Sequence, residues 1–530
     1  MYVLIGINFF PHEKKLDTNC PHQWAFLNTL SAQTPTWAEK VAPIMYKNCA
    51  GCHHVGGAAP FSLITYAEAK LYKSSIHRAV LSGYMPPWPP DTKYSQFAYS
   101  RALSDADKKA IMDWADAGAP QGDMTKAPTP PQYSNTGFIP NPDLKVQIPL
   151  FTIASNTDDY RCFPMKSGLS VDKFITQLEC IPGNGSVVHH ILIFQDQSNI
   201  CYDLDARDAA PGYTSFGGIG SNSAQLIGAW VPGSQPQIMP KGFGVKLKAN
   251  ANIVLQIHYA PGSAGQKDST VLKLKLTEGS LRELSIVPIL NHSISLTNGP
   301  LFIPANTTKT FNAKFIMPAD VTIINVAPHM HLIGKTVKAF AVPPTGDTIK
   351  LIKIDNWDFH WQGGYLFKKA IKLPRGTILQ SEAFYDNTVN NPSQPNSPPK
   401  DVSLGEATTD EMMLIYFTYT LYRAGDENID LEAATTLTGI HDTPLSKTDL
   451  TCFPNPATDA LTLRFDLKES DNLSIQIFDY QGVMVKNINN QYFLKGQNEK
   501  TLSVSDLPKG MYILKLSSDK LYGVQYFVKM

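Results

Sequence analysis

The sequence has little net charge, few cysteines and no long hydrophobic run. Its 530 residues carry 46 Lys and Arg against 46 Asp and Glu, so no net field attracts nucleic acid or an acidic membrane. The absence of a stretch of about 18 apolar residues predicts that the chain has no transmembrane helix. Only 17% of the residues are charged, whereas 35 are Gly and 39 are Pro. This mixture favours β-rich domains with many turns over long helical repeats or coiled coils.

The length predicts three to four domains, at about 150 residues per domain. At the N-terminus, residues 25–33 resemble the end of a signal-peptide hydrophobic region, with small residues around a cleavage site after Ala32. Two interpretations remain open for residues 1–33. They are either an export leader, whose true start lies near residue 25, or a disordered tail.

The first chemical motif is Cys49-Ala50-Gly51-Cys52-His53, a C-x-x-C-H attachment signature of c-type haem. Two thiols at this spacing reach two vinyl groups of the ring, and the adjacent imidazole then reaches the iron. The C-x-x-C part alone is also compatible with zinc binding or a redox disulfide.

A methionine on a stiff loop follows this motif. Met85 precedes Pro86 and Pro87, which favour an extended conformation, and its thioether is our preferred sixth ligand of the iron. His54 and His77 are the alternatives. His/Met ligation suits electron transfer rather than oxygen binding.

Two apolar patterns predict helices on either side of the motif. Residues 36–48 place Val41, Ile44 and Met45 on one face. Residues 103–118 begin with an N-cap pattern and carry an apolar stripe that ends before Gly118. The stretch 36–121 resembles a small class I cytochrome c, which implies an all-α domain with haem c held by Cys49, Cys52, His53 and Met85.

The middle of the chain contains short β-like runs with histidines inside them or at their ends. His189 and His190 are adjacent in one run, so both can bind one metal only where the strand is bulged or ends. His258 ends a second run, and His329 and His331 share a face after a third. Imidazoles suit copper, zinc, iron or nickel, and a thioether shifts the preference towards copper(I). A structural or storage copper protein and a zinc β-sandwich remain alternatives.

The order of these motifs, H-H, Q-I-H-Y, H-x-H-x-x-G-K and then D-E-M, resembles the copper type II, ascorbate-dependent monooxygenases. That family includes the peptidyl-glycine and dopamine hydroxylating enzymes. The resemblance implies a first copper, which stores and relays an electron, at His189, His190 and His258. It implies a second copper, which binds O2 and cleaves the substrate C–H bond, at three further ligands. These are His329, His331 and Met412, the last preferred over Met413, with the aromatic Tyr416 nearby.

Two positions depart from the peptide-amidating members of this family. Ala327 stands where those enzymes have an arginine, and Leu414 stands where they have an asparagine. Without an arginine fork the site cannot bind a carboxylate in bidentate fashion. We therefore expect a small organic substrate other than a glycine-extended peptide.

The remaining cysteines and histidines receive simpler interpretations. Cys162 resembles a half-cystine of the family, and Cys180 and Cys201 are further disulfide candidates, as expected for an exported protein. Cys452 can remain free, and Cys20 is removed if the leader is cleaved. Three histidines are interpreted as surface or packing residues: His292, His360 and His441.

The alternating pattern of the last eighty residues predicts a small β-sandwich. The P-N-P-A sequence at 454–457 and the strand G-M-Y-I-L-K-L at 510–516 resemble the type IX secretion C-terminal sorting domain of Bacteroidetes. That resemblance implies export through the periplasm, followed by secretion or attachment at the outer-membrane surface. An ordinary accessory sandwich domain is the alternative.

Taken together, these motifs predict a multidomain fold with a small all-α cytochrome c domain, two jelly-roll-like all-β sandwich copper domains and a C-terminal Ig-like β-sandwich. The expected boundaries are leader 1–33, haem domain 34–126, Pro-rich linker 127–145, copper halves 146–285 and 286–430, and sorting domain 443–530. The expected function is C–H hydroxylation of a small molecule with O2. Electrons come from the haem, or from ascorbate or a redox protein. The alternative is a surface electron-transfer or copper-binding haem protein without this activity.

Overall fold

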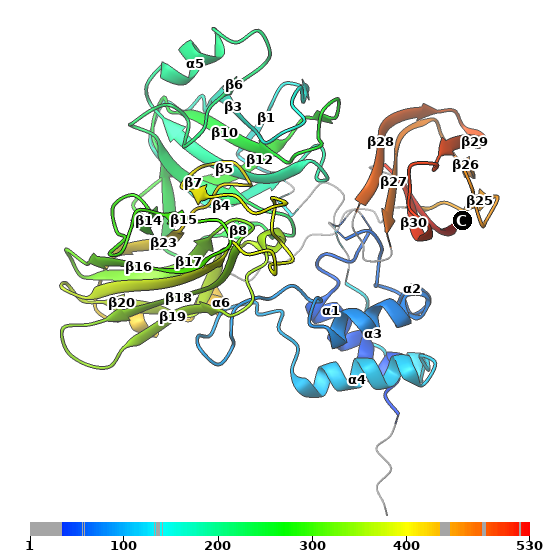
Figure 1. Ribbon diagram of the computed structural model, residues 1–530, viewed down its shortest axis with the longest axis horizontal. Helices are drawn as coiled ribbons and strands as arrows, with labels where there is room; N and C mark the ends of the chain where they lie inside the picture. The colour runs from blue at the N-terminus through cyan, green and yellow to red at the C-terminus, as the bar shows by residue number, and fades with distance from the viewer. Residues whose placement is uncertain are drawn as a thin grey trace, which may run out of the picture. The chain divides into compact units, whose positions relative to one another are not determined.

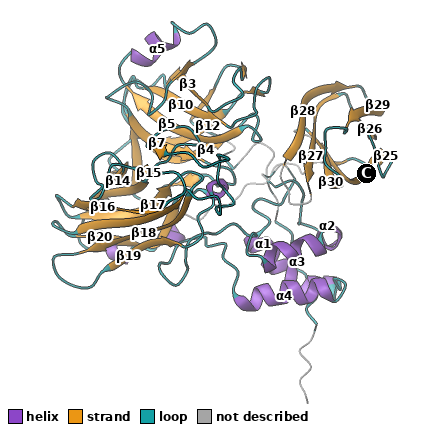
Figure 2. Cartoon of the chain, in the orientation of Figure 1, coloured by secondary structure: helices purple, strands orange, loops and turns teal. Residues whose placement is uncertain are grey.

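The computed structural model describes residues 34–530, apart from 56, 58, 132, 134–137, 140, 435–445, 480–483 and 519–520. A small helical N-terminal region is followed by several antiparallel sheets, so the chain is a multidomain and mostly β protein (Figures 1 and 2). The predicted leader, with Ala32 and Cys20, lies outside the described residues, as does His441. Within the described ranges, no helix has the length and apolar character needed to cross a membrane.

The helical region surrounds the C-x-x-C-H motif. Val41, Ile44 and Met45 are all buried there, as the periodicity of residues 36–48 predicts. The elements are η1 (Trp37–Val41), α1 (Ala42–Asn48), α2 (Tyr66–Leu71), α3 (Lys73–Leu81), α4 (Asp105–Asp116) and η2 (Met124–Lys126).

Helix α4 has the predicted signals at both ends. The Ser104 side chain accepts a hydrogen bond from the Asp107 N–H at the N-terminus, which satisfies one of the free donors of the first turn. Ile111 and Trp114 are fully buried on its apolar face. Gly118, with φ of 84°, lies two residues after the helix in the left-handed region that favours glycine.

The first β half contains two large sheets that share a core. Their strand orders are β1-β12-β4-β9-β13, with β8 paired to β4, and β6-β3-β10-β5-β7; β2 and β11 form a small third sheet. The elements are β1 (Leu144–Gln147), β2 (Phe151–Thr152), β3 (Asp159–Lys166), β4 (Lys173–Ile181), β5 (Val188–Asp196), α5 (Ile200–Asp205), β6 (Tyr213–Thr214), β7 (Gln225–Trp230), β8 (Gln237–Ile238), β9 (Phe243–Leu247), β10 (Asn252–Tyr259), β11 (Lys267–Asp268), β12 (Val271–Thr277) and β13 (Arg282–Glu283).

The second β half contains sheets β14-β23-β17-β20 and β16-β21-β18-β19, with β15 paired to β22. Its elements are β14 (Ser285–Asn291), β15 (Phe302–Ile303), β16 (Thr308–Ile316), β17 (Val321–His329), β18 (Gly334–Val342), β19 (Ile349–Ile354), η3 (Phe359–Trp361), β20 (Tyr365–Leu373), β21 (Ile378–Asp386), β22 (Val402–Ser403), β23 (Leu414–Leu421), η4 (Asp426–Asn428) and α6 (Leu431–Ala434).

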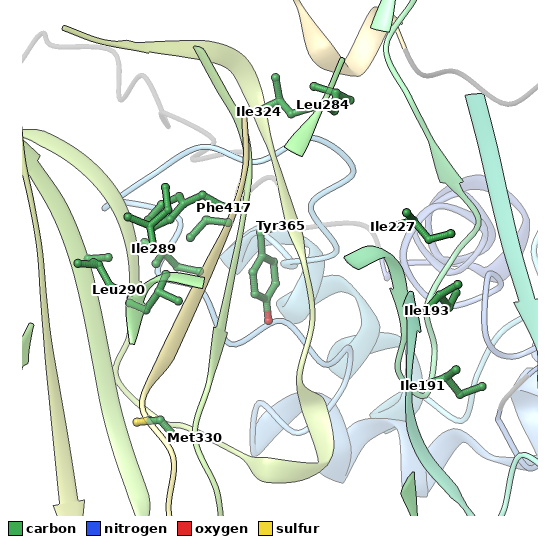
Figure 3. Packing of buried hydrophobic residues seen from close by; sticks show 14 of the residues in the cluster. Ile191, Ile193, Ile227, Leu284, Ile289, Leu290, Ile324, Met330, Tyr365 and Phe417 are labelled. Atoms are coloured by element: carbon green, nitrogen blue, oxygen red, sulfur yellow. The ribbon is translucent and has the colours of Figure 1, made fainter. Parts of the chain in front are cut away.

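One continuous hydrophobic cluster runs through both β halves. Ile191 and Ile193 belong to its part in the first half, and Ile289, Leu290 and Phe417 belong to its part in the second half (Figure 3). Strand β10 is buried at all eight positions because it lies between β3 and β5. The two halves therefore fold around a common core that holds their strand ends in place.

The C-terminal part is all β and has a hydrophobic core of its own. Its sheets have the orders β24-β31-β30-β27-β28 and β25-β26-β29. The strands are β24 (Ser446–Lys447), β25 (Leu450–Phe453), β26 (Ala460–Leu467), β27 (Asp471–Asp479), β28 (Met484–Phe493), β29 (Gly496–Ser503), β30 (Gly510–Ser517) and β31 (Leu521–Lys529).

The loop between α3 and α4 pairs with the second β half, and we call its residues 88–99 the strap. The Asp91 N–H donates to the Lys353 carbonyl at 2.8 Å, and the Ala98 N–H donates to the Leu366 carbonyl at 2.9 Å. Phe97 is 7% exposed and belongs to the common core of the two β halves. The strap thus joins the helical region to strands β19 and β20.

The cysteines correct one prediction. All six described cysteines are free thiols, so no disulfide joins the candidates Cys162, Cys180 and Cys201. Cys180 packs in the large core, whereas Cys162 and Cys201 pack with Tyr213 in a separate small cluster. Their side chains act as small apolar groups in these places.

Candidate metal centre

Three histidines meet where β5 and β10 lie side by side. The strands are antiparallel, and their register pairs His190 with His258 and then Val188 with Tyr259. His189 is therefore the extra residue of a β-bulge, which lets two successive side chains reach the same side of the sheet. The ligand atoms of His189, His190 and His258 all lie within 4.8 Å of one another.

The Nδ1 atoms of these three rings face each other. The Nδ1 of His190 lies 3.2 Å from that of His189 and 3.4 Å from that of His258. His258 directs its Nε2 to the Asp158 carboxylate at 2.7 Å, so the proton belongs on Nε2 and the Nδ1 lone pair is free. Three imidazole nitrogens around one point form a donor set for copper, zinc, iron or nickel.

Asp158 connects this site with a distant loop. Its carboxylate also accepts hydrogen bonds from the backbone N–H and the hydroxyl of Thr408. Burial acts to raise the pKa of Asp158, but the hydrogen bonds from His258 and Thr408 outweigh burial and lower the pKa to about 2. The carboxylate therefore remains ionised and holds the His258 ring in one tautomer, as partners of metal-binding histidines do.

His329 and His331 form a second pair, with ring centroids 5.1 Å apart. His329 ends β17, and its Nδ1–H donates to the Gln362 side-chain oxygen. The Nδ1–H of His331 donates to the Asp410 carbonyl at 3.1 Å. Both Nε2 atoms therefore keep a lone pair for a metal.

Met412 is held next to this pair by a buried carboxyl group. Glu411 accepts the N–H of His331 at 2.9 Å and that of Met412 at 3.0 Å on the same oxygen, and the N–H of Ile333 at 3.0 Å on the other. Burial raises the pKa of Glu411 to about 8. Met412 itself is 5% exposed, so its side chain is buried beside the loop that carries His331.

Four imidazoles of the two sites, those of His189, His190, His329 and His331, have lowered pKa values and are neutral at ordinary pH. Burial, with smaller contributions from neighbouring imidazoles, lowers the pKa of His189 to about 3 and that of His190 well below its usual value. Burial likewise lowers the pKa of His329 to about 3 and that of His331 to about 4. Neutral imidazole is the form that binds metal ions.

The two sites adjoin each other. The ring centroids of His190 and His329 are 6.2 Å apart. The Phe359 ring stacks on His189 at 4.4 Å and meets His331 edge-on at 5.6 Å. Five imidazoles from two β halves therefore line one region.

Three described neighbours of His329 on its face of the sheet, Ala327, Leu414 and Tyr416, carry no positive charge. Ala327 shares this face with His329, because they are two residues apart on β17. The register of β17 and β23 pairs Ala327 with Tyr416 and His329 with Leu414. Burial, followed by the charge of Glu406, raises the pKa of Tyr416 to about 12, so its phenol stays neutral.

The C-x-x-C-H residues lie together at the end of α1. The Nδ1–H of His53 donates to the Phe61 carbonyl at 3.0 Å, which leaves Nε2 free for a ligand. Burial lowers the pKa of His53 to about 4 and raises that of Cys49 to about 12. Cys52 is half-buried, and Met85 is half-buried on the loop after α3.

The alternative haem ligands have other partners. His54 stacks on Tyr133 with ring centroids 3.8 Å apart. The Nε2 of His77 lies 3.5 Å from the Asp116 carboxylate.

Sequence reasoning missed Asp158, Gln362 and Phe359. Asp158 precedes His258 by 100 residues, and no spacing rule connects the two. The aromatic residues Trp357, Phe359 and Trp361 close to Gln362 were a usable signal of a packed loop. The His360 side chain is 75% exposed and pairs with Asp358, which agrees with a surface role.

Two families match parts of the chain. Residues 303–437 match the copper type II ascorbate-dependent monooxygenase, C-terminal domain, and residues 451–530 match the secretion system C-terminal sorting domain. The chain therefore contains a monooxygenase C-terminal domain and a type IX sorting domain. The sorting domain indicates export, by secretion or to the cell surface. No curated protein matches the sequence.

Solved structures show only weak likeness. A β-glucuronidase of Faecalibacterium prausnitzii is 11% identical, with coverage of 48% of this chain and 41% of that chain and a TM-score of 0.13. The glycosylasparaginase PNGase F from Flavobacterium meningosepticum is 7% identical, with coverage of 52% and 90% and a TM-score of 0.20. The chain spans about two fifths of the first protein. At these TM-scores neither likeness bears on the function of the chain.

Proposed function

We propose that the chain is an exported copper monooxygenase that hydroxylates a C–H bond of a small organic substrate with O2. The observation that carries this proposal is that two possible ligand sets adjoin each other. In the first, the Nδ1 atoms of three histidines converge. In the second, His329 and His331 each have a free Nε2 atom. The family match over residues 303–437 supports copper as the metal.

The donor chemistry of both sets fits copper. One ion would be held by His189, His190 and His258, and the other by His329, His331 and Met412. The soft, neutral thioether of Met412 favours reduced copper at the second set. Bound copper supplies two one-electron centres, which together meet the electron requirement of hydroxylation. Around them, Asp158 and Gln362 hold the ring nitrogens in the tautomers that face the ions.

The substrate we infer is uncharged near its reacting carbon. Ala327 and Leu414 lie on the face of His329 where a carboxylate clamp would need polar or cationic side chains. The neutral phenol of Tyr416 shares that face and can donate a hydrogen bond to a hydroxyl or carbonyl group.

The helical region fits a c-type haem. Cys49 and Cys52 would bind the ring covalently, and His53 and Met85 would ligate the iron. The Nε of Arg101 and the Nε1 of Trp88 are buried without a hydrogen-bond partner among the described residues, and carboxylates of a haem would satisfy such donors. Bound haem supplies a one-electron carrier; ascorbate or a redox protein is its donor, and ascorbate can also reduce copper directly.

Metal analysis of the purified full-length chain tests this function. We expect two coppers and one haem per chain, and an infrared band of carbon monoxide bound to the reduced second copper. Met412→Ala should abolish that band and the coupling of O2 consumption to hydroxylation. Met413→Ala is the matched control. One copper or none in the wild-type chain, or unchanged coupling in Met412→Ala, would contradict the proposal.

A further inference from the structure

The loop 358–362 contacts both ligand sets and also the helical region. On one side, Phe359 stacks on His189, and Gln362 accepts the Nδ1–H of His329. On the other side, the Trp361 ring meets the Tyr84 ring edge-on, with centroids 6.1 Å apart. This loop therefore connects the copper ligands with a residue of the helical region.

Tyr84 immediately precedes Met85, the residue proposed to ligate the haem iron. The strap follows at residues 88–99 and fixes this part of the chain to β19 and β20 by backbone hydrogen bonds. The contact between Tyr84 and Trp361 thus belongs to a packed junction.

Packing alone does not explain a tryptophan at position 361. Its indole N–H is buried and has no hydrogen-bond partner among the described residues. A buried donor left unpaired is destabilising, and a leucine at this position would avoid that penalty. Unpaired buried groups that persist in a native structure call for another reason, such as a redox role.

We propose that Trp361 and Tyr84 form the electron-transfer contact between the helical region and the copper ligand His329. This inference rests on the proposed function. From the Trp361 ring the route continues through the backbone to Gln362 and across its hydrogen bond to His329. Phe359 provides a branch to His189 within the same loop.

The transfer balances as a single-electron exchange. With both groups bound, haem iron held by His53 and Met85 would be oxidised from Fe2+ to Fe3+ as one cupric ion is reduced to Cu+. No bond forms or breaks, and no proton moves. A small soluble reductant of the ascorbate class then returns the iron to Fe2+.

Flash reduction of the haem by a photoexcited flavin in the full chain, loaded with haem and cupric ions, tests the route. The haem absorbance reports its reoxidation by copper. We expect Trp361→Leu to slow reoxidation about tenfold or more, equivalent to about 1.4 kcal/mol in the barrier. Trp361→Phe, which keeps a ring, should slow it less. His360→Ala, in the same loop but exposed, should leave the rate unchanged, and the haem potential should be the same in every variant.

The outcomes separate this inference from the proposed function. A wild-type chain with fewer than two coppers contradicts the function itself, whereas a wild-type chain with two coppers and no haem overturns the route alone. A loaded wild-type chain that transfers at the same rate as Trp361→Leu overturns the route alone. If Trp361→Leu fails to retain copper, the reoxidation rate is measured in Tyr84→Leu instead. Tyr84 is 41% exposed, so we expect this substitution to leave the fold intact. An unchanged rate in Tyr84→Leu likewise overturns the route.

Discussion

Asp158 shows how a residue outside the ligand set determines the donor atoms of a metal site. The carboxylate receives the Nε2 proton of His258 and is itself fixed by Thr408. His258 consequently presents Nδ1 towards His190. Without the carboxylate, the ring can turn or exchange tautomers, and the three nitrogens no longer converge.

We expect Asp158→Asn to weaken copper binding at the first set by about 10- to 100-fold, which is the usual effect of removing the hydrogen-bond partner of a metal-binding histidine. The amide still accepts a hydrogen bond but carries no charge to raise the basicity of the ring. A competition titration with a copper chelator measures the affinity. Asp143→Asn is the control, because Asp143 pairs with Lys275 and bonds no histidine. Equal affinity in wild type and Asp158→Asn would mean that the carboxylate does not position the ring.

At the scale of elements, the strands and helices that carry the sites could be predicted. Strands β5, β10 and β17 contain the expected apolar runs, and α4 has its predicted cap and apolar face. From the sequence, the strand could either be bulged or end at His189 and His190. The pairing between β5 and β10 decides for the bulge, and that pairing exists only in the folded chain. Gln362 reaches His329 through a loop that has no regular periodicity, so its role was not predictable either.

Glu411 joins two such elements, the end of β17 and the start of β23. We expect Glu411→Ala to leave three buried N–H groups unpaired, at about 1 to 3 kcal/mol each, and to lower the free energy of unfolding accordingly. The second copper should be lost as well, since His331 and Met412 share the carboxyl group. Urea unfolding and metal analysis measure both effects.

A conservative variant and an exposed control variant accompany Glu411→Ala. Glu411→Gln retains an acceptor and should be milder. Glu382→Ala, at an exposed position that pairs with Lys338, should change neither quantity. Wild-type stability together with two coppers in Glu411→Ala would show that the backbone needs no such anchor.

At the scale of the whole molecule, the helical region and the β halves are joined twice. The Pro-rich linker predicted at residues 127–145 would, as a single connection, permit independent parts. The strap adds a second connection that no sequence pattern indicated, because residues 88–99 lack the alternation of a strand. The sheet edges of β19 and β20 supply its hydrogen-bond partners, and those edges exist only in the folded chain.

The strap predicts that the helical region and the β halves unfold together. Phe97 stacks on Phe367 with ring centroids 5.3 Å apart and is part of the common core. Phe97→Ala should cost about 3 to 5 kcal/mol and separate one thermal transition of these parts into two. Calorimetry, with haem absorbance as the probe of the helical region, detects the separation. Leu81→Ala, 66% exposed at the end of α3, should retain one transition. In the wild-type chain, a haem absorbance transition separate from the calorimetric transition of the β halves would mean that the strap does not couple the parts.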